Sequence, residues 1–224
     1  MRSLALRDKR FLISVPDRGA VSAIRSDPLN ALGSCVYLYA PGAGSNLDDP
    51  FGYHLAKHLP KHGIGLVRFQ FPYMEAGKRS PDRLSILQET WRAAIAAIRP
   101  SAKVLIVGGR SMGGRIGSMV VAVDGGIDAL ALFAYPLHAP GKAERTRDEH
   151  FPDLELPVLF CTGTRDSFAS PTEIKTAALK IRKARVHILQ HGDHGFAARK
   201  SDGRTRDEIW DEATAQFVEF ALTL

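Results

Sequence analysis

The stretch Val104-Leu-Ile-Val-Gly108-Gly-Arg-Ser111-Met-Gly113-Gly-Arg decides the fold of this 224-residue sequence. It begins as a short apolar run, which is typical of a buried strand, and passes through glycines and one serine into an apolar helical segment. Glycines permit the sharp turn of a nucleophile elbow, in which a serine hydroxyl projects above a sheet at the first turn of a helix. The order of strand, turn and helix therefore predicts an α/β fold with Ser111 at its functional edge.

Two other interpretations of this turn stay open. In the first, Ser111 only caps the following helix at the end of an ordinary glycine-rich connection. In the second, the glycines cradle a phosphate, because their spacing has the four-residue gap of a P-loop. The second interpretation is the weaker one, since the P-loop's Lys followed by Ser or Thr is missing and Arg110 occupies the second glycine position of a dinucleotide-binding motif.

Apolar runs of strand length alternate with segments of helical period along the rest of the chain. This alternation predicts a doubly wound α/β domain, with a mostly parallel sheet and helices on both faces. The predicted strands are Val36–Ala40, Leu66–Phe71, Val104–Val107, Leu130–Tyr135, Val158–Cys161 and Val186–Leu189. The predicted helices are Phe51–Leu59, Arg83–Ile98, Met112–Val123, Thr172–Arg182 and about Thr205–Leu222.

The length and the loops predict one domain over residues 1–224, with a β-hairpin within residues 1–30 formed by Phe11–Val15 and Val21–Ile24. The segment Pro136–Glu155 is too short for a separate cap domain, which needs about 50 residues. We therefore expect an open cleft for a small-molecule substrate. The residues expected to line it are Phe71, Tyr73, Arg110, Tyr135, His138 and Phe168.

Composition argues against several other classes of protein. The net charge of +6 is a weak field when spread over a whole surface, so no nucleic-acid partner is expected. Charged residues near the N-terminus and the lack of a long apolar run argue against a secretory signal and a membrane span. The two cysteines make no zinc site and indicate a cytoplasmic protein. We expect no metal, no cofactor, no membrane partner, and a monomer or homodimer.

A nucleophilic serine needs a base and an orienting acid, which in this fold follow it in the order acid, then histidine. Asp166 comes just after the predicted strand Val158–Cys161, and His194 follows the next one, Val186–Leu189. Because the carboxyl ends of parallel strands share one edge of the sheet, Ser111, Asp166 and His194 are predicted to form a catalytic triad.

Alternatives to two triad members remain. Asp166 also fits a plain turn, whereas Asp124 and Asp128 follow the elbow helix and should point to the wrong side. His191 remains an alternative base, and His187, inside a predicted strand, fits the core or a sheet edge better.

The remaining component would be an oxyanion hole, a pair of backbone N–H groups facing the substrate carbonyl oxygen. Met112, which follows the serine, supplies one. The other is expected from Ala43 in the small-residue loop Pro41-Gly-Ala-Gly44, which can also be read as an ordinary glycine-rich turn.

Five segments carry a resemblance to known proteins: Pro41–Gly44, Val67–Phe69, Gly108–Gly113, Tyr135–His138 and Pro157–Phe160. From about Val36 to the C-terminus, the chain resembles the α/β-hydrolase superfamily. Within it, the sequence is similar to a small family of hydrolase-like proteins, distantly related to dienelactone hydrolases, that includes bacterial proteins, a testis-expressed animal protein and a subunit of the NSL chromatin complex. The resemblance implies the triad Ser111, Asp166 and His194 but no particular substrate, and Pro41 stands where many esterases carry histidine.

These features together predict a serine hydrolase that cleaves a small acyl ester, thioester or related carbonyl compound through an acyl-enzyme. The alternative is a non-catalytic binding or adaptor protein, since the same scaffold is reused for binding. A lyase, a dehalogenase or an acyltransferase is also compatible with the fold, although a dehalogenase would carry aspartate at position 111.

Overall fold

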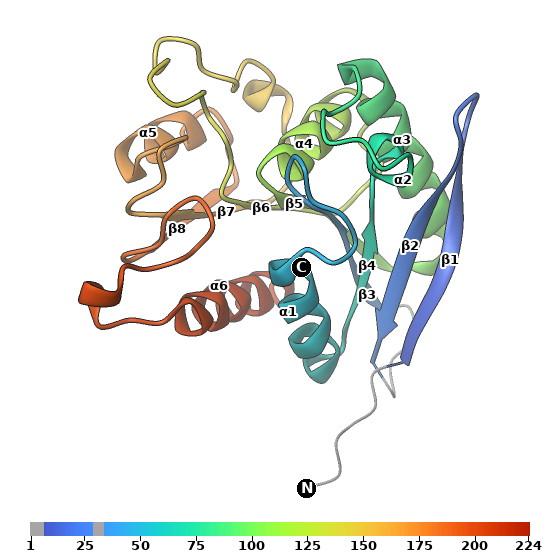
Figure 1. The fold of residues 1–224 in the computed structure, drawn as a ribbon, viewed down its shortest axis with the longest axis horizontal. Coiled ribbons are helices and arrows are strands. Elements are labelled where there is room, and N and C mark those ends of the chain that lie inside the picture. The colour runs from blue at the N-terminus through green and yellow to red at the C-terminus, as the bar shows by residue number, and fades with distance from the viewer. Residues whose placement is uncertain (1–6, 29–33) are drawn as a thin grey trace, which may run out of the picture.

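The computed structural model describes residues 7–28 and 34–224, so the parts of the predicted hairpin at 1–6 and 29–30 lie outside the described residues. Within them, eight strands form one sheet in the order β1-β2-β4-β3-β5-β6-β7-β8 (Figure 1). Their bounds are β1 (Arg7–Val15), β2 (Gly19–Asp27), β3 (Cys35–Ala40), β4 (Ile64–Phe69), β5 (Val104–Arg110), β6 (Ala129–Phe133), β7 (Val158–Gly163) and β8 (Ala184–Leu189).

The sheet is parallel from β4 through β8, and β1 and β2 add an antiparallel hairpin at one edge. Helices cover both faces, with α3, α4 and α5 on one and α1 and α6 on the other (Figure 1). The predicted fold class is therefore confirmed. The helices are α1 (Pro50–His58), α2 (Pro72–Glu75), α3 (Leu84–Ile98), α4 (Met112–Asp124), α5 (Pro171–Ala178) and α6 (Arg206–Ala221).

Two apolar clusters fill the two faces of the sheet. On the α3–α4–α5 face, Trp91 is fully buried, and its indole Nε1–H donates to the carbonyl oxygen of Gly113 over 3.0 Å. On the opposite face, Phe51 of α1 packs edge-to-face against Phe133 of β6, with ring centroids 5.0 Å apart. The continuously apolar strands of the sequence are thus explained, because both of their faces are covered.

Several element ends differ from the sequence-based predictions. The strand predicted as Leu66–Phe71 ends at Phe69, because Pro72 begins the short helix α2, which the sequence did not predict. The strand predicted to reach Tyr135 ends at Phe133, since Ala134 has a φ of 48°. The predicted helix Thr172–Arg182 is shorter, and α5 ends at Ala178.

The connection from β6 to β7, residues 134–157, contains only loops and the 3₁₀ turn η3 (Phe151–Asp153). As predicted, no cap domain is inserted there. In the described part of the chain, every helix is too short or too polar to cross a membrane.

Candidate active site

Ser111 lies at the sharp turn between β5 and α4. Its backbone has φ 51° and ψ −122°, and its N–H donates to the carbonyl oxygen of Phe133 over 2.9 Å. The neighbouring glycines are required by close packing, because a Cβ on Gly109 or Gly113 would lie 2.1 or 2.3 Å from the carbonyl oxygen of Ala40. This approach explains the Gly-x-Ser-x-Gly spacing: the turn is pressed against the end of β3.

Two loops bring the predicted acid and base to the serine. Asp166 follows β7 and His194 follows β8. The loops touch, since a Cβ on Gly163 would lie only 2.1 Å from the carbonyl oxygen of Gly192. Asp193, beside the histidine, accepts the N–H groups of Gly195 and Ala197 on its Oδ1 at 2.7 and 2.9 Å. This aspartate shapes the histidine loop, and its place in Gly-Asp-His-Gly is the turn signal that marks it.

A continuous hydrogen-bond chain joins the three residues. Nε2 of His194 lies 2.9 Å from Oγ of Ser111, and Nδ1 lies 2.9 Å from each carboxylate oxygen of Asp166. The Asp166 side chain is fully buried, while that of His194 is 22% exposed. This arrangement can accept a proton from the hydroxyl at Nε2 and stabilise the resulting imidazolium through the carboxylate.

The ring of Phe168 packs against the imidazole of His194. Its ring centroid is 4.1 Å from that of His194, and its N–H donates to Oδ1 of Asp166 over 2.8 Å. The residue is partly exposed. Phe168 therefore fixes both the imidazole plane and the carboxylate.

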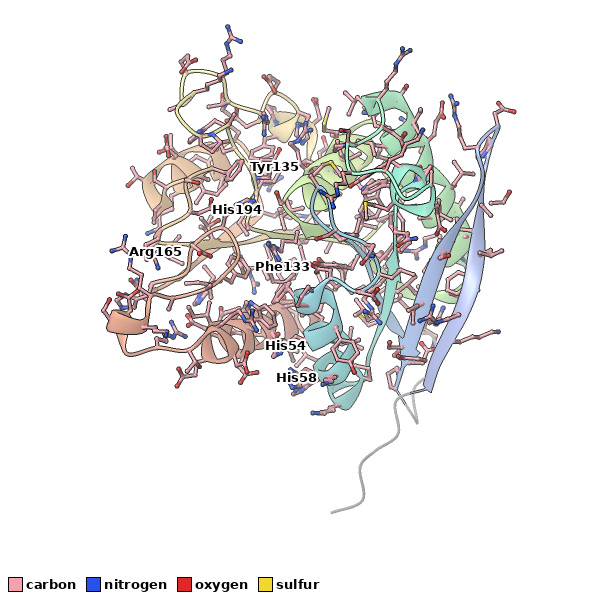
Figure 2. The ribbon with its side chains drawn as sticks, in the orientation of Figure 1. His54, His58, Phe133, Tyr135, Arg165 and His194 are labelled. Atoms are coloured by element: carbon pink, nitrogen blue, oxygen red, sulfur yellow. The ribbon has the colours of Figure 1, made fainter. Side chains whose placement is uncertain are left out.

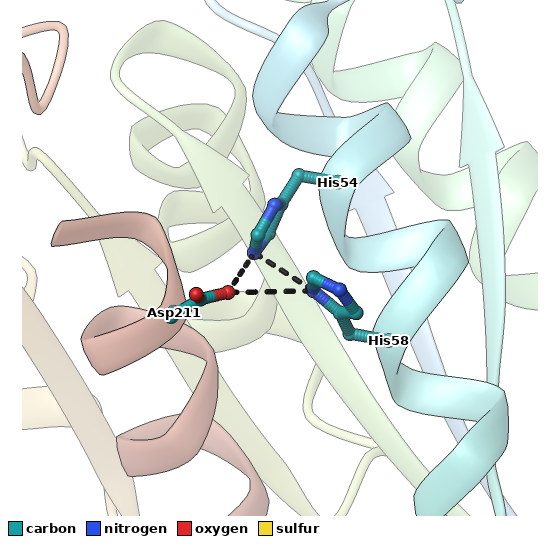
Figure 3. Close-up of side chains that lie close together, drawn as sticks. All are labelled: His54, His58 and Asp211. Carbon is teal, nitrogen blue, oxygen red and sulfur yellow. Dashed lines mark hydrogen bonds and ion pairs between the residues drawn. The ribbon is translucent and has the colours of Figure 1, made fainter. Parts of the chain in front are cut away.

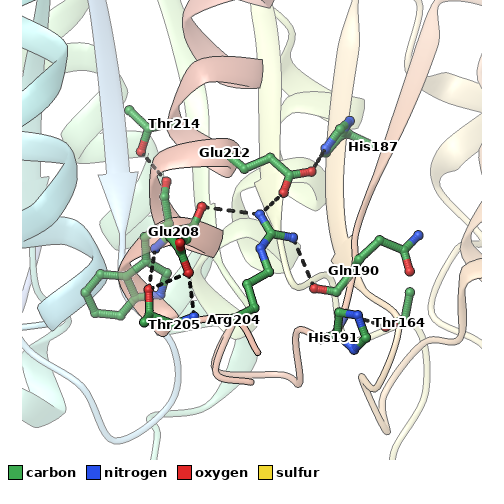
Figure 4. Close-up of polar contacts among 10 residues, drawn as sticks. Thr164, His187, Gln190, His191, Arg204, Thr205, Glu208, Glu212 and Thr214 are labelled. Carbon is green, nitrogen blue, oxygen red and sulfur yellow. Dashed lines mark hydrogen bonds and ion pairs between the residues drawn. The ribbon is translucent and has the colours of Figure 1, made fainter. Parts of the chain in front are cut away.

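A second network anchors the histidine loop to α6 (Figure 4). Arg204 pairs with Glu212 and donates to the carbonyl oxygen of Gln190 over 3.3 Å, and His187 lies 2.6 Å from Glu212. Burial raises the pKa of the Glu212 carboxyl, but the hydrogen bonds from Arg204 and His187 outweigh it, so this pKa lies below its usual range. The charged carboxylate thereby ties the loop to the helix.

The two alternative histidines lie elsewhere. The imidazole of His187 is taken up by Glu212, and the side chain of His191 is 49% exposed, with Nδ1 3.9 Å from Asp202. The backbone N–H of His191 donates to Oγ1 of Thr164 over 2.8 Å. Among the described residues, only His194 is hydrogen-bonded to the Ser111 hydroxyl.

The two N–H groups expected to form an oxyanion hole flank the serine. Met112 begins α4, and Ala43 lies in an exposed loop beside the turn. That loop is close to Ser111, because a Cβ on Gly42 would be 3.5 Å from the Cβ of Ser111. Within residues 7–28 and 34–224, neither N–H has a hydrogen-bond acceptor. Their role as an oxyanion hole stays a prediction.

Three aromatic residues expected to line the cleft are buried instead. Phe71 is 0% and Tyr135 is 1% exposed, and the Tyr135 hydroxyl donates to the carbonyl oxygen of Arg147 over 2.6 Å. Tyr73 is also 1% exposed, yet its hydroxyl accepts the N–H of Gly44 over 3.1 Å. The cleft expectation is corrected for these three residues, because their side chains pack in the core, and Tyr73 instead holds the loop that carries Ala43.

Arg110 and His138 point to protein partners. Nη1 of Arg110 lies 3.5 Å from Oδ1 of Asp49, a buried carboxylate that also caps α1 by accepting the N–H of Gly52. The Asp-Pro sequence at the start of α1 is the signal for this cap, and Asp49 was not among the predicted site residues. His138 is 6% exposed, with Nδ1 2.9 Å from the carbonyl oxygen of Ala139. The His138 side chain is therefore buried rather than exposed to a cleft, whereas the Arg110 side chain is 22% exposed and its place in a cleft stays a prediction.

Solved structures share this fold at low sequence identity. An esterase from an Arctic intertidal metagenomic library has 17% identity and a TM-score of 0.71, with 98% of this chain and 96% of that chain covered. A serine hydrolase homologue from Coxiella burnetii has 19% identity and a TM-score of 0.73, with 96% and 99% covered. A dienelactone hydrolase from Anabaena variabilis has 16% identity and a TM-score of 0.72, with 96% and 98% covered.

These likenesses extend over nearly the whole chain and concern the fold. The sequence itself matches a family model described as an alpha/beta hydrolase domain over residues 34–222, from just before β3 to just past α6. That range holds the elbow, the acid loop and the histidine loop. The chain belongs to the α/β-hydrolase domain family.

Proposed function

We propose that the protein is a serine hydrolase that cleaves a small acyl ester, thioester or related carbonyl substrate through an acyl-enzyme. The observation that carries the proposal is the hydrogen-bond chain from Ser111 through His194 to Asp166, with both contacts of the imidazole at 2.9 Å. A serine hydroxyl is a weak nucleophile alone, and this arrangement supplies the base and the orienting carboxylate that it needs. The esterases and dienelactone hydrolases that share the fold support the same class of reaction.

The first half-reaction follows from the positions of these groups. Oγ of Ser111 forms a bond to the acyl carbon as its proton passes to Nε2 of His194. The carbonyl oxygen becomes an oxyanion, which the N–H groups of Ala43 and Met112 would bind in this proposal, each contributing about 3 kcal/mol to transition-state stabilisation. When the intermediate collapses, the leaving group departs with the proton from His194.

The second half-reaction repeats this chemistry with water. His194 takes a proton from the water molecule as it attacks the acyl-enzyme, and the acid product leaves as Oγ of Ser111 recovers the proton. Asp166 holds the imidazole with Nδ1 protonated throughout, because its buried carboxylate accepts that N–H. No step requires a cofactor.

The setting of the site supports a small substrate. No cap domain follows β6, so an acyl group would be held by the loops around Ser111 and by Phe168. We place the enzyme in the cytoplasm, a proposal supported by two free cysteines, Cys35 and Cys161, as expected in a reducing compartment.

The test is covalent labelling with a fluorophosphonate probe, which reacts with activated serines. We expect stoichiometric labelling of the wild-type protein and none of Ser111→Ala, together with hydrolysis of short-chain nitrophenyl esters by the wild type and not by Ser111→Ala. Ser167→Ala is the matched control, because Ser167 lies exposed in the acid loop. Absence of labelling in the wild type, with the fold intact by circular dichroism, would favour the binding or adaptor role.

A further inference from the structure

Outside the candidate active site, three potential metal ligands meet where α1 lies against α6 (Figure 3). Nε2 of His54 is 2.9 Å from Nδ1 of His58, and Oδ1 of Asp211 is 3.4 Å from the first nitrogen and 3.8 Å from the second. The three side chains point toward one another from two helices that are far apart in sequence.

The separations match the ligand spacing of a bound zinc ion. Zinc binds histidine nitrogen at about 2.0–2.1 Å and carboxylate oxygen at about 2.0–2.2 Å, usually in a tetrahedron, so its ligand atoms lie about 3.3 Å apart. The observed distances of 2.9, 3.4 and 3.8 Å lie on both sides of that value. A cation at the centre would need only small side-chain rotations.

The two histidines lie on one face of α1. The run His54-Leu-Ala-Lys-His58 puts two imidazoles one helical turn apart, which is a common spacing for metal-binding histidines. The first ring is fixed by aromatic neighbours, stacked on Phe51 at 6.3 Å and edge-on to Trp210 at 5.5 Å. The expectation of no metal rested on the two cysteines, and the packing of α1 on α6 that completes this set is invisible in the sequence.

The charges around the rings are mixed. Lys57 and Lys61 oppose a cation here, whereas the carboxylate of Asp211 attracts it.

The competing explanation is a metal-free hydrogen bond between the two rings. That bond accounts for the 2.9 Å contact between the rings, while Oδ1 of Asp211 approaches both nitrogens without hydrogen bonding to either within the described residues. A single cation satisfies all three atoms at once. The side chain of Asp211 is 65% exposed, so it is free to turn toward the rings.

We propose that Nε2 of His54, Nδ1 of His58 and Oδ1 of Asp211 bind a zinc ion that clamps α1 to α6. The fourth position faces a groove of about 530 Å³ and is filled by water. His58 and Asp211 line this groove, together with Lys61, His62, Thr214, Ala215, Val218, Glu219 and Leu222. The site is separate from His194, which lies in another part of the molecule (Figure 2), so its role is to hold the two helices together.

The test uses the full chain after treatment with a chelator, titrated with zinc chloride by calorimetry. The wild type is expected to bind one zinc ion. Asp211→Asn and His58→Gln are expected to bind it at least about 10-fold more weakly, because loss of an outer-shell partner alone costs about 10- to 100-fold. His62→Gln, which changes a histidine of the same groove that is not a ligand, should bind like the wild type.

Thermal unfolding supplies a second readout. Zinc should raise the melting temperature of the wild type and of His62→Gln but not of Asp211→Asn. The metal-free proteins should melt alike, which shows that Asp211→Asn still folds. The proposal is overturned if the wild type binds no zinc, or if Asp211→Asn and His58→Gln bind zinc as tightly as the wild type does. Neither outcome touches Ser111, so the proposed hydrolase activity is judged separately.

Discussion

Replacing Asp166 with asparagine tests the proposed mechanism at the residue that touches no substrate. The side chain is fully buried, and its Oδ1 accepts the N–H of Phe168 at 2.8 Å, while both oxygens lie 2.9 Å from Nδ1 of His194. In Asp166→Asn, the Phe168 N–H selects the amide oxygen for the Oδ1 position. The amide NH₂ group then takes the Oδ2 position, 2.9 Å from Nδ1 of His194.

Two donors cannot face one another, so this geometry favours the imidazole tautomer with Nδ1 bare and Nε2 protonated. Nε2 lies 2.9 Å from Oγ of Ser111 and, once protonated, cannot accept the hydroxyl proton. The same substitution in a Ser-His-Asp protease lowers kcat about 10⁴-fold, which corresponds to about 5.4 kcal/mol of transition-state stabilisation. We expect a loss of that order here.

The assay is kcat and KM for a short-chain nitrophenyl ester, measured beside fluorophosphonate labelling. KM should change little, because Asp166 does not contact the acyl group in the proposed mechanism. Asp153→Asn, an exposed acid in η3, should retain wild-type kcat. A fall in kcat of less than about 10-fold in Asp166→Asn, with a fold intact by circular dichroism and Ser111→Ala inactive, would refute the assigned role of the carboxylate.

Two further predictions concern packing and thiol chemistry. Gly113→Ala places a Cβ 2.3 and 2.4 Å from the carbonyl oxygens of Ala40 and Pro41. Its free energy of unfolding, measured in urea, should therefore fall by about 1–3 kcal/mol or more. Gly42→Ala makes only ordinary contacts, so its free energy of unfolding should lie within about 0.5 kcal/mol of that of the wild type. Burial raises the pKa of the Cys35 thiol to about 11, so alkylation of the native protein should be slow at pH 8, rise toward pH 11, and become fast at pH 8 only on unfolding. Rapid native alkylation at pH 8 would contradict this burial.

Much of the fold follows from the sequence because its strands are continuously apolar and its turns carry glycine or proline. The site was also predictable, since an elbow after one strand and polar residues after two later strands must share one edge of a parallel sheet. Ser111, Asp166 and His194 come together in the structure for that reason. The sheet topology alone sets this shared edge, so it can be predicted without knowing how the side chains pack.

Side-chain orientation was not predictable in the same way. Phe71 and Tyr135 follow strands at the predicted edge of the sheet. Each strand ends two residues earlier than predicted, and each ring is buried in the core. Arg110 was expected beside the substrate. Its partner Asp49 lies at the start of α1, which covers the face of the sheet opposite to α4. Such pairings depend on contacts between segments distant in sequence, where periodicity carries no information.

The backbone of Ser111 has a consequence for how this family member balances stability against reactivity. Its φ of 51° with ψ of −122° is a conformation that side chains with a Cβ rarely adopt, at a cost of about 1–3 kcal/mol. The hydrogen bond to Phe133 and the tight packing on β3 hold it there before any substrate arrives. Glycine would be the most favourable residue for folding at this position. Only a residue with a side chain can supply the hydroxyl, and that side chain lowers the stability of the fold.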